Sequence, residues 1–174
     1  CQASIDYLHG KKFVLYPDFF TGGIIDVSDY NDGQRGGKVK VRARIEKEDN
    51  KTLVIREIPF GTTTTSLIDS IVKANEKGKI KIKRVDDNTS REVEILIHLQ
   101  PGTDPQVAIN ALYAFTDCEK SLSPCTCVIV DKHPKFLGVS EILKMNTDHT
   151  VKLLQWELNN ELKHLEDKWH MTSL

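Results

Sequence analysis

Apolar and polar residues alternate strictly over residues 38–46, directly after a glycine-rich turn. Side chains of a strand point to opposite faces with a period of two, so this pattern predicts a strand with one packed face and one charged face. The charged face carries four cations, Lys38, Lys40, Arg42 and Arg44. A second segment with three lysines, Lys79, Lys81 and Lys83, alternates with isoleucines in the same way.

Local signals predict the remaining elements before the C-terminal region. Apolar alternation predicts strands over residues 22–27, 38–48, 52–58, 80–85, 92–99 and 125–131. A helix is expected over residues 62–77, with Ser66 and Asp69 as its capping box, and another from Asp104, the N-cap, with Pro105 in the first turn. Hairpins and single helices in mixed order indicate an α+β fold with a largely antiparallel sheet and flanking helices.

A long helix is predicted over residues 140–169. Its apolar residues recur three and four positions apart, at Val151, Leu154, Leu158, Leu162, Leu165 and Trp169. Because such a helix is longer than a compact domain of this size, its stripe needs a partner outside the chain or in a second copy. We therefore expect two parts, an α+β domain over residues 1–138 and the start of a long arm over residues 139–174.

Composition excludes some classes of protein. The 174 residues carry a net charge of −1, so only the distribution of charge can indicate a polyanionic partner. Neither an apolar run of membrane-spanning length nor a secretory signal is visible, and we interpret the four cysteines as reduced thiols of a cytoplasmic protein. Since the first residue is Cys1 rather than Met, we expect a segment of a longer chain.

No catalytic or metal-binding motif is apparent. The sequence contains no phosphate-binding loop, no G-x-S-x-G turn and no H-E-x-x-H, and its six histidines are scattered. We expect no catalytic residue, metal site or cofactor in this segment. The alternating cations leave two interpretations open: a soluble edge strand, which the pattern alone favours, or a surface for a polyanion.

Residues 17–25, PDFFTGGII, resemble the PDFPTGGII segment of the A subunit of bacterial type IIA topoisomerases, DNA gyrase and topoisomerase IV. Further motifs follow in the family's order. They lie at residues 36–44 (GGKVKVRAR), 56–60 (REIPF), 67–71 (LIDSI), 111–116 (ALYAFT) and 136–143 (FLGVSEIL). The similarity departs from the family at Gly61, at residues 35–37, and at residues 146–152, where the arm helix is less basic.

The resemblance implies the tower domain of that protein together with the start of its coiled-coil arm, a non-catalytic segment that flanks bent DNA. The parent enzyme would pass double-stranded DNA, and the B subunit would supply ATP and Mg²⁺. A second copy of the A subunit would join through the arm. The DNA-cleaving tyrosine would lie outside this chain. The expected DNA-binding residues are Arg35, Lys38, Lys40, Arg42, Arg44, Lys79, Lys81 and Lys83. Gyrase and topoisomerase IV are not distinguished.

The alternative is an interaction or oligomerisation module with no DNA role, whose long helix dimerises and whose lysines serve solubility. The two interpretations differ in where the cations lie. Cations of residues 38–44 that lie beside those of residues 79–83 on one surface favour DNA flanking. Cations that are dispersed, or neutralised by Glu46, Glu48 and Glu57, favour the module.

Overall fold

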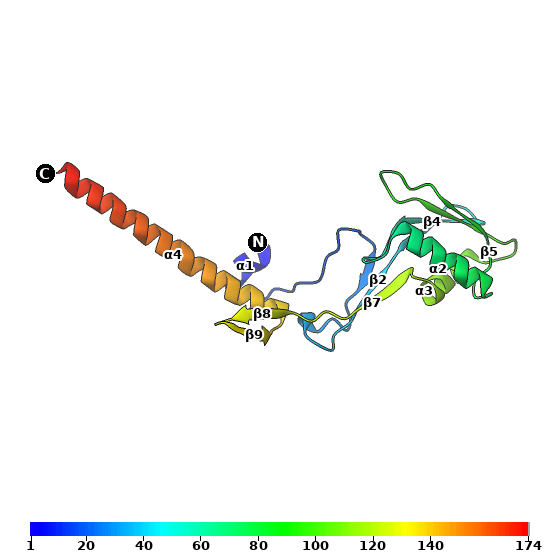
Figure 1. Cartoon of the computed structure of the whole chain (residues 1–174), viewed down its shortest axis with the longest axis horizontal. Helices are drawn as coiled ribbons and strands as arrows, with labels where there is room; N and C mark the ends of the chain where they lie inside the picture. The colour runs from blue at the N-terminus through cyan, green and yellow to red at the C-terminus, as the bar shows by residue number, and fades with distance from the viewer. Residues whose placement is uncertain (174) are drawn as a thin grey trace. The chain divides into compact units, whose positions relative to one another are not determined.

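A computed structural model describes residues 1–173 (Figure 1). The fold is α+β with antiparallel sheets and a long C-terminal helix, as the sequence predicted. The chain forms two compact units. Unit 1 comprises Cys1–Leu15, Asp32–Arg35 and Cys125–Leu174, and unit 2 comprises Tyr16–Asn31 and Gly36–Pro124. The division into residues 1–138 and 139–174 stays a prediction.

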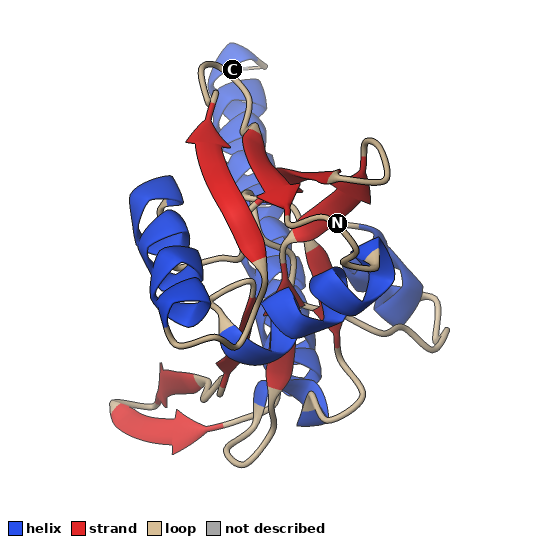
Figure 2. Ribbon diagram, turned by 90° about the vertical axis from the view of Figure 1, so that its right-hand side faces the viewer, coloured by secondary structure: helices blue, strands red, loops and turns tan. Residues whose placement is uncertain are grey.

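Unit 2 contains two antiparallel sheets, whose strands are red in Figure 2. The three-stranded sheet has the order β1-β2-β7, with bounds β1 (Ile24–Asp26), β2 (Val39–Arg42) and β7 (Glu119–Leu122). The four-stranded sheet has the order β3-β4-β6-β5, with bounds β3 (Arg44–Lys47), β4 (Thr52–Glu57), β6 (Ile95–Leu99) and β5 (Ile82–Asp87). The predicted hairpin is the antiparallel pair β3–β4.

The strand predicted over residues 38–48 is in fact two strands, β2 and β3, in different sheets. Ala43 lies between them, and its amide donates to the carbonyl oxygen of Cys118 at 2.8 Å. The register shifts between Arg44 and Ile45, and such a bulge bends a strand. The predicted alternation nevertheless holds across the break, because the apolar residues from 39 to 43 are buried and the cations are exposed.

Two helices, α2 (Thr64–Glu76) and α3 (Pro105–Phe115), share one hydrophobic core with the four-stranded sheet. Leu53 pairs with Ile97 and Ile55 with Ile95, so alternate side chains of β4 and β6 point into this core. Its largest fully buried side chains include Leu53, Ile55, Leu67, Ile71, Ile95, Ile97 and Leu112. Burial of this apolar surface stabilises unit 2 and makes its strands a rigid support for the exposed residues.

Helix capping shows one correct prediction and one wrong one. The Asp104 carboxylate accepts from the amide of Gln106 at 2.9 Å, as expected for the N-cap of α3. The predicted Ser66 and Asp69 capping box of α2 is wrong. Thr63 caps α2 instead, because its hydroxyl accepts from the Ser66 amide at 3.2 Å.

Unit 1 contains α1 (Gln2–Leu8), the hairpin of β8 (Cys127–Val130) and β9 (His133–Phe136), and α4 (Val139–Thr172). The turn of the hairpin is Asp131 and Lys132, both at positive φ, as a tight two-residue turn requires.

The start of α4 is fixed by Asp32. Its carboxylate accepts from the Ser140 amide at 3.1 and 3.2 Å and from the Ser140 hydroxyl at 2.8 Å. A side chain at Gly138 would collide with this carboxylate, so the approach requires glycine. Thr126 adds a second tie, because its hydroxyl donates to the Leu137 carbonyl oxygen at 2.7 Å.

Helix α4 has 34 residues, and beyond its anchored first turn the predicted apolar stripe is exposed from Leu154 onward, whereas Val151 is half-buried. The exposed fraction is 53% for Leu154, 64% for Leu158 and 73% for Trp169. An apolar stripe of this length normally packs against another helix.

Candidate nucleic-acid interface

The central strand β2 presents Lys40 and Arg42 to solvent, while Val39 and Val41 are buried beneath it. Lys38, directly before the strand, is also exposed. Among residues 1–173, neither Lys38 nor Lys40 takes part in an ion pair. These two lysines therefore offer charge to solvent. The interpretation of this segment as an edge strand is wrong for β2, because β2 is paired on both sides, with β1 and with β7.

Arg42 is bound on two sides. Its Nε donates to Glu119 Oε2 at 2.5 Å, and its guanidinium carbon lies 5.0 Å from the ring centroid of Tyr113. Tyr113 is itself held by its hydroxyl, which donates to the Ala43 carbonyl oxygen at 2.8 Å, and burial raises its pKa. The charge of Arg42 is thus largely balanced by Glu119, although 44% of its side chain is exposed.

Arg44 is also paired. Its Nε donates to Glu57 Oε2 at 2.9 Å, and the same oxygen accepts from the Gly23 amide at 2.6 Å. The hydrogen bonds from Arg44 and then Gly23 lower the pKa of Glu57, and Glu57 in turn raises the pKa of Arg44. Of the three glutamates that could neutralise the strand, Glu57 does so.

Lys79, Lys81 and Lys83 are exposed, and the isoleucines between them are buried, as predicted. They lie before and within β5, at the opposite edge of the four-stranded sheet from β3 and Arg44. Two strands intervene, which corresponds to about 14 Å at the usual strand spacing. The two cationic segments are therefore not neighbouring strands.

Helix α3 nevertheless contacts both cationic segments. Lys79 Nζ lies 5.6 Å from the ring centroid of Phe115, and Arg42 lies over the ring of Tyr113, two residues earlier on the same helix. Cations over aromatic faces are attracted by the ring quadrupole, so the last turn of α3 holds one cation from each segment. Arg35, by contrast, belongs to unit 1, whereas the other seven predicted contact residues belong to unit 2.

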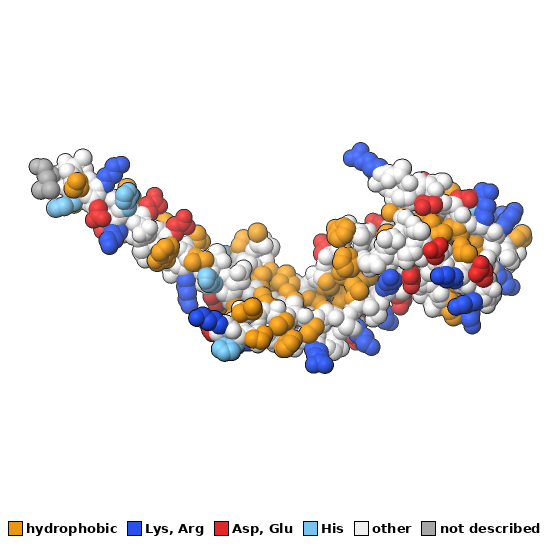
Figure 3. All heavy atoms as spheres, viewed as in Figure 1, with side chains coloured by type: hydrophobic (Ala, Val, Ile, Leu, Met, Phe, Trp, Pro, Cys, Tyr) orange, Lys and Arg blue, Asp and Glu red, His pale blue; other side chains and the backbone are white. Residues whose placement is uncertain are grey.

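Acidic residues are mixed with the cations across unit 2. Figure 3 shows Lys and Arg side chains in blue interspersed with Asp and Glu in red on the visible face. Arg56 lies 3.2 Å from Glu94 and 3.8 Å from Glu46, and Arg84 lies 2.9 Å from Asp86. Positive and negative side chains therefore alternate on this surface, and the lysines without an ion pair provide the positive charge that can attract an anion.

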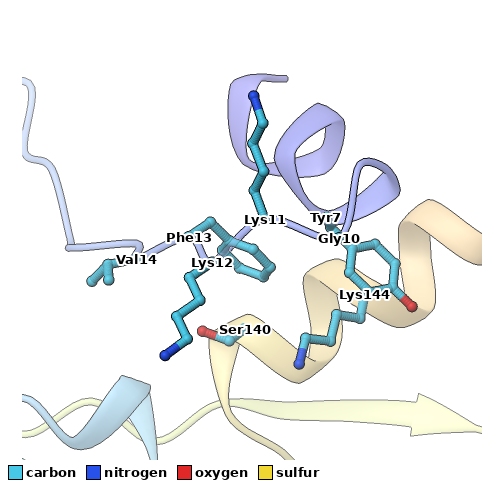
Figure 4. A pocket seen from close by; sticks show the side chains of 8 residues that line it. All are labelled: Tyr7, Gly10, Lys11, Lys12, Phe13, Val14, Ser140 and Lys144. Carbon is cyan, nitrogen blue, oxygen red and sulfur yellow. The ribbon is translucent and has the colours of Figure 1, made fainter.

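A pocket in unit 1, of about 450 Å³, was not anticipated by the sequence analysis (Figure 4). Tyr7 lines it and donates its hydroxyl to Asp148 at 3.1 Å, a bond that raises the pKa of Tyr7. Lys12 and Lys144 also line it, and Figure 4 shows Lys11 extending away from both. Its residues come from the two ends of the chain, so no local motif could have indicated it.

The described residues also bear on other chemistry. Within residues 1–173, no group of three or more His, Cys, Asp or Glu side chains could hold a metal ion. In the same range, no helix is long and apolar enough to cross a membrane. The half-buried His98 has Nε2 3.0 Å from Asp86 Oδ2. Lys51 and Arg84, which no sequence motif indicated, line a pocket together with His98.

Sequence comparisons define the class of protein. The sequence model of the family described as the A subunit of DNA gyrase/topoisomerase IV matches residues 1–174. The chain therefore belongs to this family of type IIA topoisomerase proteins, as its motifs indicated.

Individual relatives come from both branches. The chain is 41% identical to the A subunit of DNA topoisomerase 4 from Borreliella burgdorferi over 161 residues, which cover 92% of this chain and 25% of the relative. It is 34% identical to the A subunit of DNA gyrase from Lawsonia intracellularis, over 96% of this chain and 21% of the relative. For the A subunit of DNA gyrase from Helicobacter pylori, identity is 32% over 92% of this chain and 20% of the relative. The chain thus spans a quarter or less of each relative's length.

Proposed function

We propose that this chain is the tower segment of the A subunit of a type II DNA topoisomerase. It is a non-catalytic scaffold that flanks the DNA while the parent enzyme passes one duplex through another. The observation that carries the proposal is the family match over the whole chain. The exposed lysines of a strand held in a buried framework support it, because they give the scaffold a surface for phosphate.

The proposed contact residues are Arg35, Lys38, Lys40, Arg42, Arg44, Lys79, Lys81 and Lys83. Lys38 and Lys40 are the principal contacts, because neither takes part in an ion pair among the described residues, although Asp26 lies opposite Lys40 on β1. Arg42 and Arg44 contribute less, since Glu119 and Glu57 balance their charges. Each arginine still has further N–H donors for a phosphate oxygen. Phosphate contacts would offset the cost of bending the DNA, a few kcal/mol by elastic estimates.

The parent enzyme's other requirements lie outside this chain in the proposal. On the family resemblance, ATP and Mg²⁺ would be held through the B subunit. A second copy of the A subunit would join through the arm that α4 begins, whose apolar stripe is exposed. We expect the parent enzyme to work in the cytoplasm, on the family resemblance alone.

The second candidate is an oligomerisation module with no DNA role. Three observations favour it: the two cationic segments are not neighbouring strands, Arg42 and Arg44 are paired with carboxylates, and the stripe of α4 is exposed. On this view Lys38 and Lys40 keep the surface of the sheet soluble.

Fluorescence anisotropy of the 174-residue chain on a duplex of about three helical turns separates the two candidates. The tower proposal expects weak binding whose affinity falls steeply between about 50 and 200 mM salt. The triple variant Lys40→Glu, Arg42→Glu, Arg44→Glu should weaken binding equally across DNA sequences and flatten the salt dependence. Absence of binding at the lowest salt would overturn the DNA role and leave the module.

A further inference from the structure

A second concentration of positive charge lies in unit 2, around the strands β4, β5 and β6. A pocket of about 380 Å³ is lined by Lys51, Lys83, Arg84, His98, Leu99 and Pro101. Of its cations, only Lys83 belongs to the predicted DNA-binding set. Lys51 comes from the β3–β4 turn and Arg84 from β5, so the pocket gathers charge from segments more than thirty residues apart in sequence.

Strand register brings these residues together. On β6, His98 lies opposite Thr52 of β4 and opposite Arg84 of β5, so all three form one row across the sheet. The register of β5 shifts between Ile82 and Arg84, which makes Lys83 the extra residue of a bulge. A bulge redirects the side chain of its extra residue, and here both Lys83 and Arg84 line the pocket.

The polar groups are held in place by the sheet. Asp86 Oδ2 lies 2.9 Å from Arg84 Nη2 and 3.0 Å from His98 Nε2, so one carboxylate orients both side chains. His98 Nδ1 lies 3.5 Å from the Thr52 hydroxyl. The main chain of Lys51 is fixed as well, since its carbonyl oxygen accepts from the Leu99 amide at 2.7 Å.

The charge balance favours an anion. Lys51, Lys83 and Arg84 line the pocket, whereas the neighbouring carboxylates, Asp86 and Asp49, are already bonded. Asp86 bonds to Arg84 and His98, and Asp49 accepts from the Lys51 amide at 2.6 Å. Asp86 balances the charge of Arg84, so the net positive charge of the pocket comes from Lys51 and Lys83, whose ammonium groups take part in no ion pair among residues 1–173.

We propose that this pocket binds a phosphate group. Arg84 would donate two N–H bonds to one phosphate, and Lys51 and Lys83 would act as point charges on either side. The volume exceeds that of a single phosphate and fits a diphosphate, or a phosphate with its attached sugar. The ligand's source is either a free phosphorylated compound or a nucleic-acid backbone. The site does not depend on the proposed DNA role of β2.

Titration calorimetry with inorganic pyrophosphate tests the site on the 174-residue chain. Lys51→Gln, Lys83→Gln and Arg84→Gln should each weaken pyrophosphate binding at least tenfold. Arg84→Lys should weaken pyrophosphate binding by less than Arg84→Gln, because the charge remains although the paired N–H donors are lost. The control is Lys73→Gln on the exposed side of α2, which removes the same charge and should leave affinity within twofold. Circular dichroism would verify that each variant folds.

Two results would overturn the site: no pyrophosphate binding by the unaltered chain, or an equal loss in Lys73→Gln. Duplex anisotropy with Arg84→Gln then separates the two sources. A parallel loss of pyrophosphate and duplex binding assigns the site to the DNA backbone, whereas loss of pyrophosphate binding alone assigns it to a free phosphorylated compound. Lys40→Glu, which alters only β2, should lose duplex affinity and keep pyrophosphate affinity, so failure of one proposal leaves the other testable.

Discussion

The ion pair between Arg42 and Glu119 leads us to predict that removal of the Glu119 charge makes the salt dependence of DNA binding steeper. Glu119→Gln keeps the size and a hydrogen-bond acceptor beside Arg42 Nε but removes the charge that balances the guanidinium. Arg42 stays over the Tyr113 ring, with 44% of its side chain already exposed. The cation would then be free to neutralise a phosphate.

The magnitude follows from counterion release. Each additional phosphate neutralised makes the slope of log affinity against log salt more negative by about 0.9. Over a fourfold rise in salt, Glu119→Gln should therefore lose about 3.5-fold more affinity than the unaltered chain. Lys40→Gln should change the slope by the same amount in the opposite direction, because Lys40 takes part in no ion pair among residues 1–173, although Asp26 lies opposite it on β1.

The assay is duplex anisotropy at several salt concentrations, with Glu92→Gln as the matched control. Glu92 is exposed and takes part in no ion pair of the described residues, so this variant changes net charge equally without releasing a cation. Identical slopes for Glu119→Gln and Glu92→Gln would refute the reasoning, since they would show that Arg42 is not held back by Glu119. A thermal melt of each variant would verify that β7 is intact.

Three further predictions concern the framework. Burial raises the pKa of the Cys118 thiol to about 11, so a thiol reagent near pH 8 should modify the three exposed cysteines quickly and Cys118 only after unfolding. The pKa of Glu57 is below its usual 4.5, so the contribution of this carboxylate to stability is complete above pH 4.5 and is lost as pH falls through the folded-state pKa. The difference in melting temperature between the unaltered chain and Glu57→Gln should therefore shrink on acidification. A difference that stays constant with pH would contradict this prediction. Ile97→Ala, at a fully buried position of β6, should cost about 2–5 kcal/mol in chemical denaturation, whereas Ile129→Ala, at a position 78% exposed, should cost about 0.5 kcal/mol or less; equal losses would disprove the core assignment.

Local patterns predicted what depends on local geometry. Period-two alternation identified the buried and exposed faces of residues 38–46, and the Asp104-Pro105 signal gave the start of α3. By contrast β7, with the sequence EKSL, was missed because its one apolar residue gives no alternation. The strand is formed by pairing with β2 in the sheet, and a single-sequence pattern does not contain that partner.

The sequence pattern also could not show which cations of the candidate interface are paired with carboxylates. Arg42 meets a carboxylate 77 residues away and Arg44 one 13 residues away, so four cations that look equivalent in sequence divide into two paired arginines and two unpaired lysines. Affinity for a polyanion depends on the counterions released, so cations without a carboxylate partner contribute more to binding than the total number of cations in the sequence suggests. The sequence indicated the surface but could not rank its residues.

The glycines at residues 22–23, part of the segment that resembles the family, have a structural role. Gly23 lies at φ +92°, and a side chain there would approach the Arg42 carbonyl oxygen to 2.6 Å. Only this close approach lets the Gly23 amide reach Glu57, the carboxylate that also holds Arg44. The motif therefore does not itself present charge to a ligand. It docks a loop on the junction of β2 and β3, where the chain passes from one sheet to the other, and so helps to hold the carboxylate that pairs with Arg44.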